Sequence, residues 1–279
     1  MSELITQSRP DADLAFPRLL RDWRQKRRLS QLDLALAAGV SQRHLSFLES
    51  GRARPSRNMI LHLSETLDVP LRDRNAWLTA AGFATLFRTR TLDDPQMEQV
   101  MNAVKMMLTA HEPFPAIALD RAWNVRMSNK PFDRLGAMMG EDVWARIGGG
   151  ERNLMRLFFH PLGIRPFVTN WSAVGPLMWR RAQREAEAVA GSEMMAVLDD
   201  LAPLQEPHIL WSAADPALLP VMPFSLQIKD LKISMFAVIA TFGTAQDITA
   251  DDLRIETLFP ADPETEALFR KAGGGKGAA

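Results

Sequence analysis

The sequence predicts an all-α bundle of five helices at the N-terminal end, followed by a separate α + β domain. Before residue 90, apolar residues recur at helical spacing and no strand pattern occurs. After Pro115, short apolar runs of strand length alternate with helical stretches. The chain has 279 residues, of which 47% are apolar, and this is enough material for two cores.

Each helix of the first domain has its own local signals. Four apolar residues at i, i+3, i+4 and i+7 mark the first helix, which starts near Pro17 (Phe16, Leu19, Leu20 and Trp23). Ser30 and Asp33 resemble a capping box that begins the second helix, and Gly39 ends it. The remaining helices are predicted from Ser41 to Ser50, from Ser56 through Leu67, and from Leu71 to Ala81.

The second domain is predicted to follow a polar linker and a connecting helix that begins at Pro95 and ends before Pro113. The predicted strands are 116–120, 125–128, 222–228, 231–242 and 255–259, and the predicted helices are 132–139, 141–147, 153–159, 170–189 and 194–201. The resulting divisions are a flexible N-terminus (1–15), the first domain (16–87), the linker and connecting helix (88–112), the second domain (113–270) and a disordered Gly-rich tail (271–279).

Composition excludes several classes of function. The chain has no cysteine, which excludes disulfides, thiolate metal sites and thiol catalysis. Net charge is zero, yet residues 1–92 hold 15 Lys and Arg against 9 Asp and Glu, which favours a polyanion as the partner of the first domain. Met1–Pro10 is polar, unlike a signal peptide, and Ile233–Phe242 is about half as long as a membrane span. We therefore expect a soluble, cytoplasmic protein that does not bind membranes.

The most informative segment is Leu29–Gly51, where a short glycine turn separates two helices. This is the spacing of a helix-turn-helix, whose second helix enters the major groove of double-stranded DNA. The second helix is predicted to turn Gln42, Arg43, His44, Ser46 and Phe47 outward. Of these, Arg43 can pair with guanine and Gln42 with adenine.

Other polar residues around this segment suit the DNA backbone. Gln31 begins the preceding helix and can reach a phosphate, and the following loop supplies three guanidiniums, from Arg52, Arg54 and Arg57. The alternative is a helical bundle with a solvated polar face. That alternative does not explain the glycine turn, the serine cap and the arginine loop together.

Residues 16–82 resemble the XRE family of helix-turn-helix regulators, which includes the phage lambda and 434 repressors, and the run Leu29–Gly51 carries the resemblance. The resemblance implies a lambda-repressor-like domain with base-contacting positions at Ser41, Gln42, Arg43, His44, Ser46 and Phe47. Some relatives have a polar residue in place of Phe47. The sequence leaves open whether this ring contacts a thymine methyl group or packs inward.

The second domain opens with a strand ending at Asp120, a turn, a strand leading to Asn129 and a helix, and this resembles a PAS domain. The whole chain is similar to the MmyB-like branch of XRE regulators, on motifs at 29–57 (LSQLDLALAAGVSQRHLSFLESGRARPSR), 111–116 (HEPFPA), 165–171 (RPFVTNW) and 241–262 (TFGTAQDITADDLRIETLFPAD). The resemblance implies a PAS-like domain that binds a small apolar ligand, with fatty acids as the ligand class.

Aromatic residues and methionines in the second domain suit such a cavity, because Met adapts to a flexible chain. The candidate lining residues are Met127, Phe236 and Val238 on the sheet and Phe158, Phe159, Trp171 and Met178 on the helices. Arg165 and Arg180 are the candidate cations for a ligand carboxylate. The alternative for the apolar residues is a place in the core, and for each arginine a surface ion pair.

The residues indicate no enzyme. The five histidines are far apart, without the i, i+3 or i+4 pairs of a helical metal site, and no nucleotide-binding or nucleophile motif occurs. Haem ligation by His160 or His208 stays open, and otherwise we expect no cofactor beyond a bound fatty acid or similar apolar effector. We expect a ligand-responsive transcription regulator that binds a palindromic operator as a homodimer.

Two alternatives from other classes remain open at this point. One is a constitutive DNA-binding protein whose second domain serves only for dimerisation or partner docking. The other is an enzyme acting on a small acyl compound, against which the missing nucleophile–base pair argues.

Overall fold

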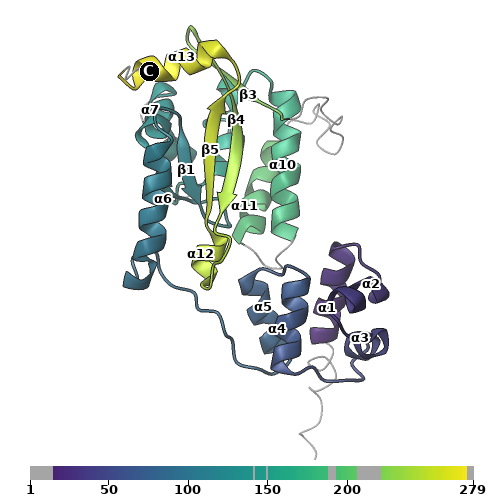
Figure 1. The fold of residues 1–279 in the computed structure, drawn as a ribbon. Coiled ribbons are helices and arrows are strands. Elements are labelled where there is room, and N and C mark those ends of the chain that lie inside the picture. Colours follow the sequence, from purple (N-terminus) through teal and green to yellow (C-terminus); the bar gives the residue numbers. More distant parts are fainter. Residues whose placement is uncertain (1–14, 141, 149, 188–192, 206–220, 275–279) are drawn as a thin grey trace, which may run out of the picture. The chain divides into compact units, whose positions relative to one another are not determined.

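The computed structural model describes residues 15–140, 142–148, 150–187, 193–205 and 221–274 (Figure 1). The chain forms two compact units. One consists of the residues up to Arg90 together with Thr244–Asp251, and the other of Thr91–Gly243 and the residues from Asp252 on. Of the predicted flexible N-terminus (1–15), only Ala15 is described, and it begins the first helix. The predicted disordered tail (271–279) begins too early, because Lys271 and Ala272 still belong to the last helix, and residues 275–279 lie outside the described residues.

Between residues 15 and 90 the N-terminal unit forms five α-helices, as predicted: α1 (Ala15–Lys26), α2 (Gln31–Ala37), α3 (Gln42–Glu49), α4 (Arg57–Thr66) and α5 (Leu71–Ala80). The apolar stripes of these helices meet in one core, with Leu20, Leu34, Leu45, Ile60 and Trp77 each buried completely. The ring of Phe16 meets Trp77 edge-on, with the centroids 5.7 Å apart, so α1 packs against α5.

The predicted caps of the N-terminal unit are confirmed. Ser30 and Asp33 form a reciprocal capping box at the start of α2. The Ser41 hydroxyl accepts a hydrogen bond from the His44 amide at 3.2 Å and starts α3. Between these helices Gly39 has φ +61°, a left-handed conformation that costs glycine little. The turn between α2 and α3 is therefore set by local chemistry.

The second unit is an α + β domain, which confirms the predicted class. Its strands are β1 (Ala116–Leu119), β2 (Val125–Ser128), β3 (Phe224–Ile228), β4 (Leu231–Thr241) and β5 (Arg254–Pro260). They form one antiparallel sheet of order β2-β1-β5-β4-β3. Its helices are α6 (Glu98–Ala110), α7 (Lys130–Met138), α8 (Val143–Ile147), α9 (Leu154–Phe159), α10 (Trp171–Glu187), α11 (Glu193–Leu201) and α13 (Pro263–Ala272), with three short 3₁₀ turns at Pro95–Met97, Arg165–Phe167 and Ala202–Leu204.

Two helices were not predicted from the sequence. Helix α12 (Ile248–Asp252) is only five residues long, too short for a periodic apolar pattern. Helix α13 has a recognisable start, because the Asp262 carboxylate accepts from the Thr265 amide at 2.7 Å and Pro263 occupies the first turn. These two residues are the start signal that the sequence analysis missed.

The two faces of the sheet pack against different helices (Figure 1). On one face, Ile117, Leu226 and Met235 join the large core that also contains Phe158 and Trp179 from the helical side. On the other face, α6 buries a smaller cluster made of Val104, Leu108, Ala116, Ala118 and Ile255. Side chains alternate between the faces along each strand, so neighbouring residues of one strand belong to different cores.

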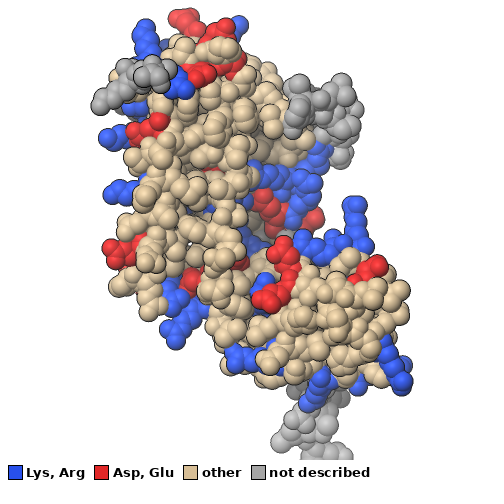
Figure 2. Space-filling model, in the orientation of Figure 1, with Lys and Arg blue, Asp and Glu red and all other residues tan. Residues whose placement is uncertain are grey.

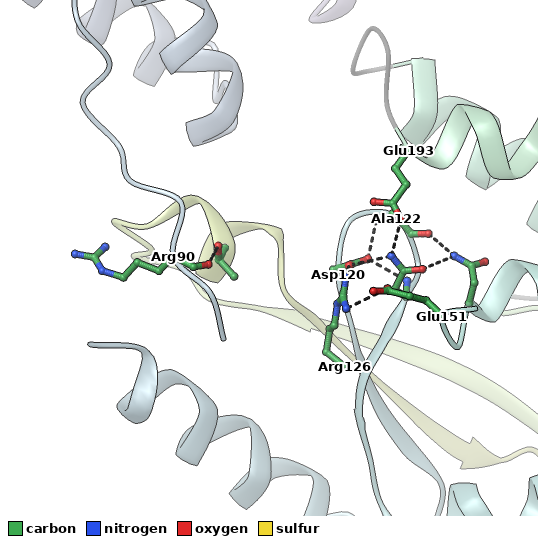
Figure 3. A network of polar contacts seen from close by, with 9 residues as sticks. Arg90, Asp120, Ala122, Arg126, Glu151 and Glu193 are labelled. Carbon is green, nitrogen blue, oxygen red and sulfur yellow. Dashed lines mark hydrogen bonds and ion pairs between the residues drawn. The ribbon is translucent and has the colours of Figure 1, made fainter. Parts of the chain in front are cut away.

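A polar network fixes the turn between β1 and β2 to the helices beside it (Figure 3). The Asp120 carboxylate receives hydrogen bonds from the Asn124 amide and from the Arg126 side chain. The Asn124 side chain donates to Glu193 of α11, and the buried Asn153 side chain donates to Asn124 at 2.9 Å. Buried amides that satisfy several partners give this end of the sheet a unique geometry.

Gly163 lies against the backbone of α9, and we expect Gly163→Ala to destabilise the second unit. A Cβ atom there would stand 2.1 Å from the Leu157 carbonyl oxygen, a backbone atom that cannot rotate away. The expected loss of unfolding free energy is about 1–3 kcal/mol, measured by urea denaturation. The matched control is Gly136→Ala within α7, where a Cβ meets nothing within 4 Å and the change should stabilise slightly. Equal effects of the two substitutions would contradict this prediction.

Candidate DNA-binding surface and ligand cavity

Helix α3 has one buried side and one polar side. Leu45 and Leu48 are completely buried and attach the helix to the core. Gln42 and Arg43 are exposed at its first turn, and His44 and Ser46 are partly exposed. Ser41 is exposed and also caps the helix. The structure therefore agrees with the outward direction predicted for these side chains. Their hydrogen-bond donors lie at the start of α3, the part of a recognition helix that contacts base edges in the major groove.

The structure answers the question about Phe47. This ring is only partly buried and lies outside the core cluster of the unit. The Arg43 guanidinium sits 5.3 Å from the ring centroid, one helical turn away on the same face. Phe47 is thus a surface residue that orients Arg43, and it remains available to a neighbouring methyl group.

A buried carboxylate that the sequence reasoning missed holds the helices of this surface together. Glu49, at the end of α3, is 2% exposed. Arg24 of α1 reaches both of its carboxylate oxygens, at 2.6 and 2.8 Å, and Arg24 also donates to the Leu29 carbonyl. Gln31 donates to the same carboxylate at 2.8 Å, so the start of α2 is held as well. The sequence did hold a signal for the burial of Glu49: it lies four residues after the buried Leu45, on the same face of the helix.

The charge of Glu49 is stabilised by these contacts. Burial by itself would raise the pKa of this carboxyl, but hydrogen bonds from Arg24 and Gln31 outweigh it and hold the pKa below its ordinary value. The hydrogen bond to Glu49 likewise raises the pKa of Arg24. The pair is therefore ionised at neutral pH and functions as a fixed joint between α1, α2 and α3.

The predicted phosphate-binding arginines follow α3. Arg52 and Arg54 are exposed in the loop, and Arg57 is exposed at the first position of α4. Ser56 caps α4 by accepting from the Met59 amide at 3.1 Å, which positions this loop. Figure 2 shows Lys and Arg side chains at the surface of the helical unit. Such a set of guanidiniums can track a DNA backbone without selecting a sequence.

The second unit contains a cavity of about 390 Å³, within the range of small-molecule sites. It lies between the sheet and helices α7 to α10. Its apolar wall includes Leu135, Trp144, Leu154, Phe158, Met178 and Phe224. A few polar side chains also reach it, namely Asp133, Asp142, Arg152, Arg181 and Glu256. An apolar chamber with a few charged groups suits a ligand that has a long apolar part and a polar end.

Some of the predicted lining residues are in this cavity and others are not. Phe158 and Met178 line it. Phe159 and Trp171 lie behind this wall in the core, where each ring stands 5.3 Å from Phe158. These two residues support the wall, and we correct their prediction as lining residues.

The three predicted sheet residues face away from the cavity. Phe236 stacks on Phe259 at 5.8 Å, while its neighbour Ala237 lines the cavity. Val238 is 47% exposed, and Met127 packs against the smaller apolar cluster between α6 and the sheet. The prediction for these residues was wrong, because apolar composition does not tell which face of a strand a side chain occupies.

The predicted cations are also corrected. Arg165 donates to the Leu204 carbonyl at 2.7 Å and lies over the Trp171 ring, and neither Arg165 nor Arg180 lines the cavity. The cavity instead receives Arg181, one residue further along α10, and Arg152. Successive side chains on a helix point about 100° apart, so Arg181 reaches the cavity while its neighbour Arg180 points elsewhere.

Arg181 belongs to a buried ionic cluster. Its guanidinium donates to Glu256 at 2.8 Å and to Glu185 at 2.9 Å, and Arg254 donates to Glu185 at 2.6 Å. Both guanidiniums lie over the Trp123 ring. Burial by itself would lower the pKa of Arg181, but the charges of Glu256 and Glu185 raise it above its ordinary value. The positive charge of Arg181 is therefore already neutralised.

Arg152 has a different environment. It is exposed, its guanidinium lies 5.7 Å from the Trp144 ring centroid, and it has no carboxylate partner in the part of the chain that the structure describes. Among the described residues, no cluster of His, Asp and Glu could hold a metal ion. His160 accepts from the Leu162 amide and does not line the cavity, and His208 lies outside the described residues.

A helix-turn-helix with a polar second helix, followed by a domain with a ligand-sized cavity, defines a ligand-regulated DNA-binding transcription regulator. The model of the MmyB-like transcription regulator ligand binding domain matches residues 100–272, and a helix-turn-helix model matches residues 20–73. The chain therefore belongs to the MmyB-like transcription regulators, and its DNA-binding domain is of the XRE type. Both matching families are domains of regulators and not of enzymes.

No curated protein matches the sequence. Among the described helices, none has the length and apolar character needed to cross a bilayer.

Proposed function

We propose that this regulator binds a palindromic operator as a homodimer in the cytoplasm, and that its effector is a fatty acid or a similar apolar carboxylate. The observation that carries the ligand proposal is the apolar cavity lined by Arg152, a cation that has no carboxylate partner among the described residues. The homodimer follows from the DNA-binding mode, because two-fold related helices contact half-sites one helical turn apart.

The surface of α3 supports specific recognition of bases. Arg43→Ala is expected to weaken binding to a specific operator by about 1–3 kcal/mol and to relax the base preference at one position. The reason is the loss of a bidentate contact to guanine. A binding titration against operator variants measures this. Equal loss of affinity on every sequence would show that Arg43 contacts only phosphate.

The arginine loop supports binding to the DNA backbone. Arg54→Ala is expected to weaken binding to all duplexes by a similar factor and to reduce the salt dependence of the affinity by about one counterion. Arg43→Ala is the matched variant, since its effect should depend on sequence. An unchanged salt slope for Arg54→Ala would remove this residue from the set of phosphate contacts.

The cavity supports an effector with an apolar chain and an anionic end. The apolar wall favours burial of a hydrocarbon chain by about 0.8 kcal/mol for each CH₂ group. Arg181 is paired with Glu256 and Glu185, whereas Arg152 can bind a carboxylate without breaking an ion pair to any described residue. We therefore place the carboxylate at Arg152 and the chain among the residues of the wall.

Organic extraction of the purified protein followed by mass spectrometry tests the ligand class directly. A stoichiometric fatty acid is the expected result, together with a thermal shift when palmitate is added to the delipidated protein. Absence of any lipid, with no shift across a panel of fatty acids, would favour a constitutive DNA-binding protein whose second domain only mediates dimerisation or partner docking.

Arg152→Gln is expected to weaken palmitate binding by about tenfold, equivalent to about 1.4 kcal/mol for one charge-assisted contact at an exposed site. The matched control is Arg134→Gln on α7, which removes an exposed arginine between two lining residues without touching the cavity. Isothermal titration of each variant with palmitate and with the uncharged methyl ester measures these affinities. An equal loss for acid and ester would contradict a carboxylate contact.

A further inference from the structure

The connection between β4 and β5 packs with the N-terminal unit. We refer to Thr244–Asp251 as the β4–β5 connection. It is part of the compact unit that contains α1 to α5, although its two ends continue into β4 and β5 of the ligand-binding domain. These two strands carry Ala237, Glu256 and Leu258, which line the cavity. A change in the positions of β4 and β5 therefore acts directly on the ends of this connection.

One contact of the β4–β5 connection is at the start of α5. The Leu71 amide donates to the Asp251 carboxylate at 3.0 Å. Pro70 precedes this helix and supplies no side-chain cap. Asp251 therefore takes the place of the missing N-cap, where a negative charge also suits the helix dipole.

A second set of contacts ties the connection to the segment after α5. Asp247 is 8% exposed and forms an ion pair with Arg90 at 2.5 Å. The Thr249 hydroxyl donates to the Arg90 carbonyl at 2.6 Å, and the Ile248 amide donates to the Arg88 carbonyl at 2.9 Å. The short helix α12 is thus held by its side chains and by its backbone.

The segment after α5 is itself fixed to that helix. The Asn75 side chain donates to the Phe87 carbonyl at 2.7 Å and accepts from the Leu86 and Phe87 amides. Helix α5, residues 86–90 and the β4–β5 connection therefore form a closed ring of hydrogen bonds. Trp77 of α5 packs on Phe16 of α1, the helix whose Arg24 holds the end of α3. The ring is linked through packed side chains to the base-contacting helix.

We propose that the β4–β5 connection is the coupling element through which occupancy of the cavity changes the affinity for DNA, with Asp251, Asp247 and Thr249 as its positioning residues. This inference rests on the proposed function. In this proposal, the connection is either bound to α5 and residues 86–90 or released from them. A ligand that prefers one arrangement of β4 and β5 shifts the equilibrium between these two states and so changes the position of α5. Coupling of this kind typically changes affinity by about 5–150-fold.

The test compares the DNA affinity of the delipidated full-length protein with and without palmitate. Wild-type protein defines the coupling factor, which is the ratio of the two dissociation constants. In Asp251→Asn and in Thr249→Val this factor is expected to fall towards one, while palmitate affinity is retained. Asp252→Asn is the matched control, since Asp252 pairs with Arg121 in the ligand-binding unit and should leave the factor unchanged.

Hydrogen exchange in the wild-type protein provides a readout that does not depend on any variant. Palmitate should change the protection of the Leu71 and Phe87 amides, because these donate within the ring. Thr249→Val preserves side-chain volume and guards against a variant that simply unfolds.

The outcomes are distinct. If the DNA affinity of the wild-type protein does not change with any fatty acid, the proposed function and this inference are both overturned. A wild-type coupling factor that persists in both variants, with unchanged protection at Leu71 and Phe87, would overturn only the inference. Variants that lose DNA affinity equally with and without palmitate would show that the connection is a purely structural support, which also overturns it.

Discussion

Glu49→Gln is expected to lower the unfolding free energy of the N-terminal unit by about 3–5 kcal/mol, because it removes one partner of a buried ion pair. The Glu49 side chain is 1% exposed and that of Arg24 is 12% exposed, so water cannot replace the lost contact. The glutamine keeps one acceptor oxygen but replaces the other with an NH₂ group, so Arg24 and Gln31 can no longer both donate as they do to the carboxylate, and Arg24 loses its counter-charge. A loss of this size is comparable to the total stability of many small domains.

Urea denaturation followed by circular dichroism measures this effect. Glu65→Gln is the matched control, since Glu65 is 72% exposed and stands 3.8 Å from Arg74, a surface pair worth about 0–1 kcal/mol. DNA binding should fail in Glu49→Gln above the temperature at which the unit unfolds. If the two variants proved equally stable, the joint described for α1, α2 and α3 would be wrong.

The same carboxyl predicts a pH dependence. The pKa of Glu49 is lowered in the folded protein, so its stabilising contribution is complete above the unfolded pKa of about 4.5 and is lost as pH falls through the lower folded value. Wild-type stability should therefore decline below about pH 4.5 more steeply than that of Glu49→Gln. Parallel curves for the two proteins would contradict an ionised, buried Glu49.

Arg181→Met is expected to cost about 3 kcal/mol in the ligand-binding unit. It would leave Glu256 buried with Arg254 as its cationic partner, whose Nε atom is 3.7 Å away, and would leave Glu185 with Arg254 and the Trp123 indole N–H as partners. The methionine keeps most of the apolar contact with Trp123, so the loss reports mainly the charge. Because Arg181 also lines the cavity, the ligand-binding wall should loosen in the same variant.

Arg184→Met is the matched control for Arg181→Met, because Arg184 is exposed on the same helix. Thermal unfolding with and without palmitate separates stability from ligand affinity. The expected result is a lower melting temperature for Arg181→Met alone and a reduced palmitate-induced shift. A neutral effect of Arg181→Met would show that the cluster around Trp123 contributes nothing measurable, as many ion pairs do.

Local patterns allowed much of the fold to be predicted. The Ser30 and Ser41 caps and the Gly39 turn depend on neighbours within a few residues, and the structure confirms each of them. The outward face of α3 was also predictable, since Leu45 and Leu48 mark the buried side. The same reasoning failed for the sheet, where Phe236 and Val238 are as apolar as residues in a cavity wall but occupy the other face.

By itself, the sequence determined the two-domain organisation and the helix-turn-helix, because these depend on periodicity and caps that lie close together along the chain. The class of regulator came from the resemblance of its motifs to a known family. Only the tertiary structure decided which residues line the cavity, that Arg152 and Arg181 reach it, and that Glu49 joins three helices. It also placed the β4–β5 connection with α5, from which it is separated by 180 residues at the Leu71–Asp251 hydrogen bond. Such contacts depend on strand register and on helix rotation, and a one-residue change in either moves a side chain to a different face.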